Sequence, residues 1–410
     1  MGFQTGLSGL NASSKNLDVV GNNIANVNTT GFKNSRAEFT SLVASSVGPG
    51  TSTNAAGLGV AIDAVAQQFS QGNLTITGNA LDLAINGAGF FQLELADGSI
   101  AYSRAGNFKL DNNGSIITNT GASLRGYPTD TAGVATSTTP GALVLPTGAP
   151  VAAQATTSIT AELNLDASDT RVYNAGTDTP PRTTYGTALT VFDTQGSPIA
   201  FGVNFTRAAS TAAAAPAPAL DNWDVRDSAG TVLFQLRFDS TGSLYAPATN
   251  PTVTIATPSP TTPDISATLD VSGITQFAAA FGVTNLSQDG YTSGSFVSLS
   301  ISETGVITAR YSNGESQAAG MVALADFRNV QGLAPVGGNN WIETFTSGQP
   351  LLGQPGQGKF GVTRAGALED SNVDLTAELV NMMTAQRAYQ ANAQTIKTQD
   401  QVMQTLVNLR

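Results

Sequence analysis

The C-terminal stretch Asn372–Arg410, NVDLTAELVNMMTAQRAYQANAQTIKTQDQVMQTLVNLR, decides how the rest of the chain is organised. It contains neither Pro nor Gly, and apolar or small residues recur at alternating steps of four and three from Leu375 onward. A repeat averaging 3.5 residues is typical of a helix whose apolar stripe faces one partner, as in a coiled coil. Such a helix would be roughly 55 Å long, and only Gln386 and Asp400 interrupt its stripe.

The N-terminal stretch Gln4–Val27 has the same four-and-three spacing, which begins at Phe3 and extends to Asn28. This pattern predicts a second amphipathic helix. Neither helix can bury its stripe alone in water. The two helices can pack on their own domain, pair with each other, or pair with copies from neighbouring chains. The last two possibilities make everything between the helices one long insertion and favour an assembly protein.

Polar residues and a glycine stand where the two helices should begin and end. Ser371, Asn372 and Asp374 can accept hydrogen bonds from the free amides at the start of the C-terminal helix. The residues that can end the N-terminal helix are Asn26, Asn28 and Gly31. We predict that the two apolar stripes form an assembly seam. Its residues are Phe3, Leu7, Leu10, Leu17, Ile24, Leu379, Met382, Tyr389, Ile396, Met403 and Val407.

The composition fits a large chain that packs against other protein. Its 410 residues are too many for a single core, and roughly two to four domains are expected. Charged residues make up only 11%, against a usual value of about 25%. The net charge is −11 and the pI about 4.4, without any run of Lys or Arg. These values argue against nucleic acid and anionic membrane as partners.

The chain has no Cys and no His. This composition excludes disulfides, Cys nucleophiles, Cys/His zinc sites and His-based catalytic triads. No apolar run approaches the roughly 20 residues that span a bilayer. The start, MGFQTGLSGL, lacks the basic region and the apolar core of a cleavable secretory signal. Export would therefore depend on a segment that is not cleaved.

Between the helices the sequence predicts β-structure with a recurring turn. An acidic residue stands a few positions before a Gly, and apolar alternation then resumes. The copies are Asp111–Ile116, Asp193–Gly196, Asp239–Leu244 and Glu303–Ile307. Asp can bond to its own backbone and Gly takes positive φ, so these units predict hairpins. Asp111–Gly114 also offers oxygen ligands for calcium, but it lacks the alternating acids and distal Glu of a calcium-binding loop.

The composition changes at about Val151 and again at about Asn285, which predicts one β domain inserted into another. The predicted fold is multidomain and mainly β, with nested, discontinuous β domains and long terminal helices that pair as a coiled coil. The predicted divisions are 1–28 with 372–410 for the terminal helical coiled-coil domain, 29–73 with 360–371 for the connector, 74–150 with 286–359 for the inner β domain, and 151–285 for the inserted outer β domain.

No residue pattern argues positively for an enzyme, and the sequence predicts no catalytic residue, cofactor or metal site. The scattered candidate acids are Asp82, Glu94, Glu162 and Asp264. Two carboxylates suffice for glycoside hydrolysis, so a secreted carbohydrate-active or carbohydrate-binding β protein remains an alternative. Trp223 and Trp341 could then form sugar platforms, although packing in the core or in turns suits them better.

Motifs at both ends of the chain resemble those of the bacterial flagellar rod and hook family of axial proteins. The stretch Ala25–Lys33, ANVNTTGFK, looks like the family signature near the N-terminus. The signature residues are Ala25, Asn26, Asn28, Thr30, Gly31 and Phe32. Leu83–Phe91 and Ser103–Phe108 resemble the shared core, and Ser371 to the end resembles the family tail. The resemblance covers roughly the first 130 and last 80 residues and leaves out the middle.

The resemblance implies a structural subunit of a curved, flexible helical tube that transmits torque from the rod to the filament. It implies terminal helices that line an inner channel, with β domains stacked outward. It also implies other copies of the chain, the rod, the hook cap, the hook–filament junction proteins and the flagellar type III export apparatus as partners. Distal rod members share both ends but are shorter, so the length favours hook members and leaves the distal rod as the alternative.

Overall fold

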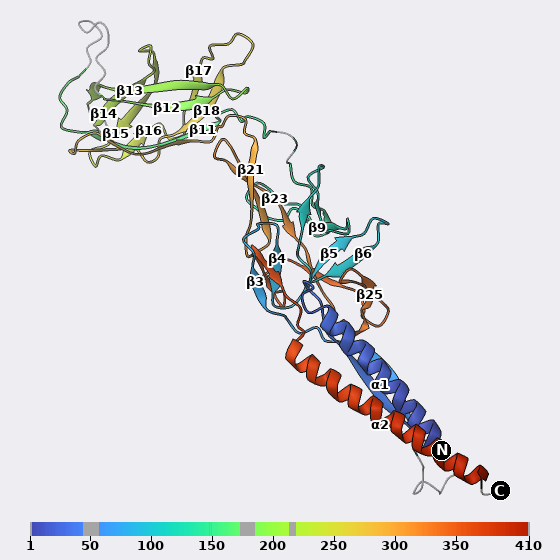
Figure 1. The fold of residues 1–410 in the computed structure, drawn as a ribbon. Helices are drawn as coiled ribbons and strands as arrows, with labels where there is room; N and C mark the ends of the chain where they lie inside the picture. Colours follow the sequence, from blue (N-terminus) through green and yellow to red (C-terminus); the bar gives the residue numbers. More distant parts are fainter. Residues whose placement is uncertain are drawn as a thin grey trace. The chain divides into compact units, whose positions relative to one another are not determined.

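The computed structural model describes residues 2–43, 57–146, 148, 150–172, 185–212 and 219–408. The chain divides into two compact units, which are taken separately here. Unit 1 consists of Met1–Gly148, Ser298–Arg310 and Ser316–Arg410. Unit 2 consists of Ala149–Val297 and Tyr311–Glu315. Both terminal segments, blue and red in Figure 1, therefore belong to unit 1.

The terminal helices α1 (Gly2–Ala25) and α2 (Leu375–Asn408) lie side by side and antiparallel (Figure 1). Both predicted helices and their mutual contact are confirmed, and the last two residues of the second prediction lie outside the described residues. The Asp374 carboxylate caps α2 by accepting hydrogen bonds from the amides of Thr376 and Ala377 at 2.9 and 3.2 Å. Within the part of the chain that the structure describes, no helix is long and apolar enough to span a membrane.

A long antiparallel hairpin follows α1 in a region where the sequence analysis expects a connector. Its strands are β1 (Ser35–Val43) and β2 (Gly57–Gln67). The alternating residues Val60, Ile62, Ala64 and Ala66 lie in β2, whereas the residues of β1, SRAEFTSLV, do not alternate clearly. Both strands pack along α1. The connector therefore contains a defined structural arm.

The main sheet of unit 1 runs in the order β21-β22-β23-β9-β5-β6-β26-β25. These strands are β21 (Phe296–Ile301), β22 (Val306–Tyr311), β23 (Ser316–Val322), β9 (Ser123–Tyr127), β5 (Phe90–Glu94), β6 (Ile100–Ser103), β26 (Asn340–Ile342) and β25 (Ala334–Gly337). Strands attached to it are β7 (Lys109–Leu110), β8 (Ile116–Ile117), β10 (Gly141–Ala142), β24 (Leu324–Asp326) and β27 (Leu351–Gly353). A 3-10 turn, η1 (Val330–Gly332), precedes β25.

Two short strand pairs tie the segment that leads into α2 back to the β body. One pairs β28 (Val362–Ala365) with β4 (Leu83–Asn86), and the other pairs β29 (Ala367–Glu369) with β3 (Leu74–Ile76). The alternating run Leu83–Ile85 and the paired Phe90-Phe91 supply buried side chains to the core of unit 1. Phe91 packs edge-on against Phe108 with ring centroids 5.3 Å apart.

Unit 2 is a sandwich of two sheets. One has the order β17-β18-β11-β19 with β20 on β11, and the other has the order β12-β13-β14-β15-β16. The strands are β11 (Ser158–Asp166), β12 (Tyr185–Phe192), β13 (Pro198–Thr211), β14 (Leu220–Arg226), β15 (Val232–Phe238), β16 (Leu244–Ala246), β17 (Thr252–Ile255), β18 (Ile265–Asp270), β19 (Thr275–Phe277) and β20 (Gly282–Gln288). Both sheets contribute to one apolar core around the buried Trp223.

The recurring acidic turns are hairpin turns. At Asp111–Gly114 the amide of Gly114 donates to the carbonyl of Asp111 at 2.9 Å, and Gly114 has a φ of 81°. The turn joins β7 to β8. The turns at Asp193 and Asp239 repeat this bond and the positive φ of the glycine. The carboxylates of Asp193 and Asp239 also accept from amides two and four residues further on. The hairpin prediction is therefore confirmed for these three turns. In the fourth, the amide of Gly305 donates to Ser302 O and not to Glu303.

We expect Phe91→Ala to lower the free energy of unfolding of unit 1 by about 3–5 kcal/mol, because it opens a cavity in the core. Phe91 is fully buried. Phe345→Ala is the matched control, since Phe345 is fully exposed, and its effect should stay within about 0.5 kcal/mol. Urea unfolding followed by fluorescence measures both. Equal effects of the two substitutions would contradict this description of the core.

Candidate functional site

The helices α1 and α2 approach each other through small residues. A Cβ on Gly6 would lie 3.2 Å from Ile396 Cγ1, and one on Gly9 would lie 2.9 Å from Asn392 Nδ2. Asn392 Nδ2 donates to Ser13 Oγ at 3.3 Å. Glycines at these positions let the two backbones come close, so the pair is held by close van der Waals contact over α1.

A buried polar contact links the C-terminal end of α1 to the N-terminal end of α2. In the side chain of Asn23, Nδ2 donates to Ser35 O at 2.8 Å, and Oδ1 accepts from the backbone amide of Ser35 at 2.9 Å. Asn23 Nδ2 also lies 3.4 Å from Glu378 Oε1. Asn23 and Glu378 are both buried. One side chain of α1 thus links α1, β1 and the first turn of α2.

The positions of α2 that face α1 follow a heptad. Glu378 and Ala385 are buried and Asn392 is half-buried, at a spacing of seven residues. They lie one residue before Leu379, Gln386 and Ala393, the positions that the four-and-three spacing from Leu375 selects. The seam residues that stay exposed are Phe3, Leu7, Leu379, Tyr389, Met403 and Val407, and the half-buried ones are Leu10, Leu17, Ile24, Met382 and Ile396. The helix pair therefore leaves much of the apolar seam open to solvent.

Three charged side chains are buried together where the two helices meet the β body. Lys33 Nζ lies 2.5 Å from Glu369 Oε1, and both side chains are fully buried. Arg104 Nη1 lies 3.2 Å from the second oxygen, Glu369 Oε2. The amide of Gly72 also donates to Glu369 Oε1 at 3.0 Å. One carboxylate therefore serves two cations that come from distant parts of the chain.

The cations of this cluster have further partners. Lys33 Nζ donates to Ser70 O at 2.8 Å, and Arg104 Nη2 donates to Gly87 O at 2.9 Å. The Arg104 guanidinium also lies 5.3 Å from the centroid of the Phe90 ring. Burial lowers the pKa of Lys33, an effect that the negative charge of Glu369 opposes. Burial likewise lowers the pKa of Arg104. Removal of the shared carboxylate would leave buried Lys33 without its paired anion, and Arg104 with only the charge of Asp326.

Neighbouring backbone bonds extend the cluster into a junction of both chain ends. The amide of Gly31 donates to Glu369 O at 2.8 Å. Asn372 Oδ1 accepts from the amide of Asn34 at 2.7 Å, and Asn372 Nδ2 donates to Gln68 O at 2.7 Å. Asn372 thus joins the two ends of the β1–β2 hairpin and does not cap α2. The segments after α1 and before α2 are held at one place in unit 1.

Gly31 has a structural reason to be glycine. Its φ is 69°, which favours glycine, and a Cβ there would lie 2.5 Å from Ala105 N. The other signature residues form the turn around it. Asn26 caps the end of α1 through a 2.9 Å bond from Nδ2 to Asn22 O, and Thr30 O accepts from Asn339 Nδ2 at 2.9 Å. Ala25 and Asn28 are exposed, and Phe32 is half-buried.

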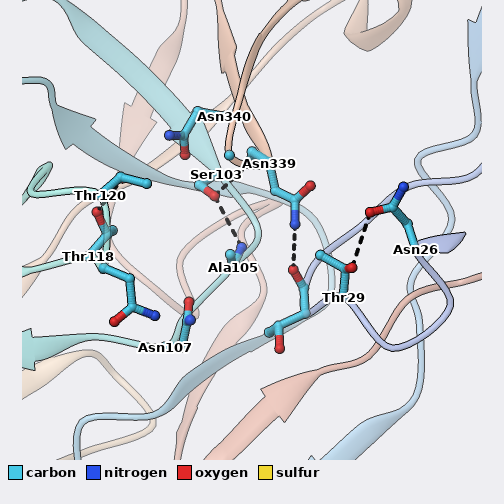
Figure 2. Close-up of a pocket in the computed structure, with 12 residues that line it drawn as sticks. Asn26, Thr29, Ser103, Ala105, Asn107, Thr118, Thr120, Asn339 and Asn340 are labelled. Atoms are coloured by element: carbon cyan, nitrogen blue, oxygen red, sulfur yellow. Dashed lines mark hydrogen bonds between the residues drawn. The ribbon is translucent and has the colours of Figure 1, made fainter. Parts of the chain in front are cut away.

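A polar surface pocket of about 360 Å³ lies beside this turn (Figure 2). Its lining residues are Asn26, Thr29, Thr30, Ser103, Ala105, Asn107, Thr118, Asn119, Thr120, Gly338, Asn339 and Asn340. Figure 2 shows their amides and hydroxyls bonded to one another, including Thr29 Oγ1 to Asn26 Oδ1 at 3.1 Å and Ser103 Oγ to Asn339 O at 2.8 Å. The lining has no ionisable side chain and offers no acid–base pair.

Three of the four candidate acids have structural partners, and both tryptophans lie in cores. Glu94 pairs with Arg125 at 3.1 Å, and Asp82 accepts from Thr77 Oγ1 at 2.6 Å. Glu162 and Asp264 belong to unit 2, and Asp264 accepts from the amide of Thr257. Both tryptophans are buried, so neither offers a face to a sugar. In the described parts of the chain, no group of three or more acidic side chains is placed to hold a metal ion.

Sequence reasoning missed the roles of Lys33, Arg104 and Glu369. Lys33 and Arg104 stand in the motifs quoted above, but nothing in their local pattern indicates that they share a partner. The available signal was scarcity, because charged residues inside glycine-rich apolar motifs are conspicuous in a chain with only 11% charge. Glu369 could not be identified from its surroundings, since its pairing depends on contacts more than 250 positions away.

Four family models match consecutive or overlapping parts of the chain. They are described as flagella basal body rod protein (residues 3–33), flagellar hook protein FlgE/F/G D1 domain (84–177), flagellar basal body protein FlaE D2 domain (163–291) and flagellar basal body rod FlgEFG protein C-terminal (364–409). The terminal models cover most of α1 and α2.

Similar proteins match along the whole chain. The flagellar hook protein FlgE of Escherichia coli is 38% identical and that of Salmonella typhimurium 40% identical, each over 100% of both chains. The flagellar hook protein FlgE of Treponema pallidum is 32% identical over 99% of this chain and 98% of its own. A crystal structure of the Helicobacter pylori flagellar hook protein FlgE2 matches in fold, with a TM-score of 0.56 and 16% identity over 72% of this chain and 100% of that one.

We expect Glu369→Gln to lower the free energy of unfolding of unit 1 by about 3–5 kcal/mol, because it leaves buried Lys33 and Arg104 without their anion. Asp370→Asn is the matched control: this neighbouring carboxylate is exposed and bonds only to the Thr75 hydroxyl among the described residues, so its loss should cost less than about 1 kcal/mol. Urea titration measures both. A Glu369→Gln chain as stable as the parent would mean that the cluster does not hold the junction.

Proposed function

The chain belongs to the flagellar hook protein FlgE family, whose members are structural hook subunits and not enzymes. From this premise we propose that copies of the chain assemble through their terminal helices into a tube. The observation that carries the proposal is the open apolar seam on α1 and α2. Met403 is 60% and Val407 71% exposed. Exposed apolar side chains along a paired helix favour burial against another protein surface.

The seam suits contact with further copies of the same chain. Full burial of a Leu, Met or Val side chain is worth about 1.5–3 kcal/mol, so several seam residues can stabilise a lateral contact together. The contact would join different faces of neighbouring copies. Such heterologous contacts repeat without closing and generate a helical tube. Membership of the hook family favours this tube over a closed ring.

The remaining roles follow from family membership and are proposals. The tube would be curved and flexible and would transmit torque from the rod to the filament. Its partners would be the rod, the hook cap, the hook–filament junction proteins and the type III export apparatus. Export would use the uncleaved N-terminal region, and the subunit would function outside the cell. The few charges of the surface suit interfaces that slide as the tube bends.

We also propose the division into a terminal helical domain, a connector, an inner β domain and an inserted outer β domain. Contacts inside unit 2 support the insertion, because its two ends are paired. The amide of Val151 donates to Gly294 O at 2.8 Å, and Gln154 pairs with Tyr291 in the same way. A segment whose ends meet can be replaced by a short linker with little cost in loop closure.

We expect Ile396→Asp to abolish tube formation while leaving the thermal unfolding of the β units unchanged. A charge buried in an apolar contact costs several kcal/mol, and Ile396 lies outside the β cores. Gln394→Asp adds the same charge at an exposed position outside the seam and should still assemble. Electron microscopy of concentrated protein gives the readout. Normal tubes from Ile396→Asp would remove α2 from the assembly contact.

The predicted outer domain, 151–285, is extended here to 294, so that the replaced segment ends at the paired Val151 and Gly294. Its replacement by a short Gly/Ser linker should leave a chain that folds and still forms tubes. These tubes should be straighter than those of the parent, because an outer domain that touches its neighbours would stabilise the bent form. Curvature measured by electron microscopy tests this expectation. Tubes as curved as the parent would place the origin of curvature in unit 1, and failure to fold would mean that the insertion is part of the core.

A further inference from the structure

One aromatic side chain of unit 1 is displayed completely to solvent. Phe345 is 102% exposed, whereas Trp341 of the preceding strand β26 and Phe327 are buried. It stands in the turn Thr344–Gly348, between β26 and β27. Leu351, 58% exposed, lines the same groove of about 630 Å³. The turn therefore presents an apolar surface that the chain itself does not cover.

The turn that carries Phe345 is held by several hydrogen bonds. The Ser347 side chain is buried and donates to Thr344 O at 2.9 Å, while the amide of Thr344 donates back to Ser347 Oγ at 2.9 Å. Thr344 Oγ1 donates to Gly332 O at 2.5 Å, and Asn329 Nδ2 donates to Thr346 O at 3.1 Å. Because the turn is already ordered, docking of Phe345 would require little further loss of conformational entropy.

The groove beside Phe345 has a basic rim. Arg328 and Lys359 line it and are exposed, and neither forms an ion pair with another described residue. Asp326 also lines the groove, but it is half-buried and its carboxylate accepts from the amide of Phe327 at 2.9 Å. A basic apolar surface on a chain with a net charge of −11 suits an acidic partner.

The hairpin of β1 and β2 carries a surface of complementary character. Phe39 and Ile62 are direct cross-strand partners and are 41% and 39% exposed, and Val65 is 52% exposed. A Cβ on Gly59 would collide with Ser8 of α1. Gly59 therefore lies on the face of β2 that contacts α1. Because side chains alternate between faces, Ile62, three residues further on, lies on the opposite face together with its cross-strand partner Phe39. Exposed Asp63 stands beside them as the unpaired residue of a β-bulge, between Ile62 and Ala64.

We propose that the Phe345 turn of one copy docks on the open face of the β1–β2 hairpin of a second copy. The inference rests on the proposed function, because it assigns one contact within the hook polymer. Phe345 and Leu351 would pack on Phe39, Ile62 and Val65. Arg328 and Lys359 would face Asp63. The two surfaces differ, so the contact is heterologous and can repeat without closing.

Disulfide trapping tests the contact directly, because the chain contains no Cys. Full-length Phe345→Cys and Val65→Cys chains are mixed, polymerised and oxidised with copper–phenanthroline, and the products are separated on a non-reducing gel. The mixture should give covalent dimers, and each variant polymerised alone should not. A chain with both substitutions should give a ladder of multimers. The control pairs Phe345→Cys with Val134→Cys, an exposed position elsewhere in unit 1, and should give no dimer.

Tubes from the mixed variants without dimers would overturn the contact and leave the proposed function intact. Dimers from Phe345→Cys alone would also overturn it, because they would show two turns meeting each other. Absence of tubes from the parent chain would overturn the proposed function as well.

Assembly measurements give a second test. We expect Phe345→Ala to raise the critical concentration for polymerisation about tenfold or more, since burial of the ring is lost. Lys359→Glu should raise the critical concentration, and Asp63→Lys added to it should restore the parental value. An unchanged critical concentration in Phe345→Ala would contradict the contact.

Discussion

The Glu369 carboxylate, shared between buried Lys33 and Arg104, is the interaction on which the arrangement of both chain ends depends. Two cations and one anion without access to water are costly unless each keeps good partners. Here backbone groups supply further partners: Ser70 O and Gly87 O accept from the cations, and the amide of Gly72 donates to the carboxylate. The cluster therefore holds three distant segments of unit 1 at the point from which both helices leave.

The junction separates two roles within unit 1. In the β part of unit 1, the buried apolar core around Phe91 stabilises the fold. Beyond the junction, α1 and α2 contact each other through Gly6, Gly9 and polar side chains and leave apolar residues uncovered. Close packing of small residues keeps the helices together with few of the larger side chains, such as Ile396 beside Gly6. The exposed apolar side chains stay available for contact with other copies.

The sequence predicted the features that depend on local pattern. The period of the terminal helices, the hairpin turns at Asp111–Gly114 and its relatives, and the β character of the middle are all visible in short windows. The buried cluster was not predictable in this way, because the partner of Lys33 lies 336 residues away. The sequence also did not predict which residues of α2 face α1. Buried Glu378 and Ala385 each lie one residue before the position that the four-and-three stepping selects, Leu379 and Gln386.

Amide hydrogen exchange, compared between dilute monomer and polymer, tests the central claim most directly. If the seam is completed by neighbouring copies, the amides of Leu379–Val407, which among the described elements mainly α1 covers in the monomer, should become much more strongly protected in the polymer. The amides of Leu83–Ile85 in the core should be equally protected in both. No gain in protection of Leu379–Val407 on polymerisation would contradict the account.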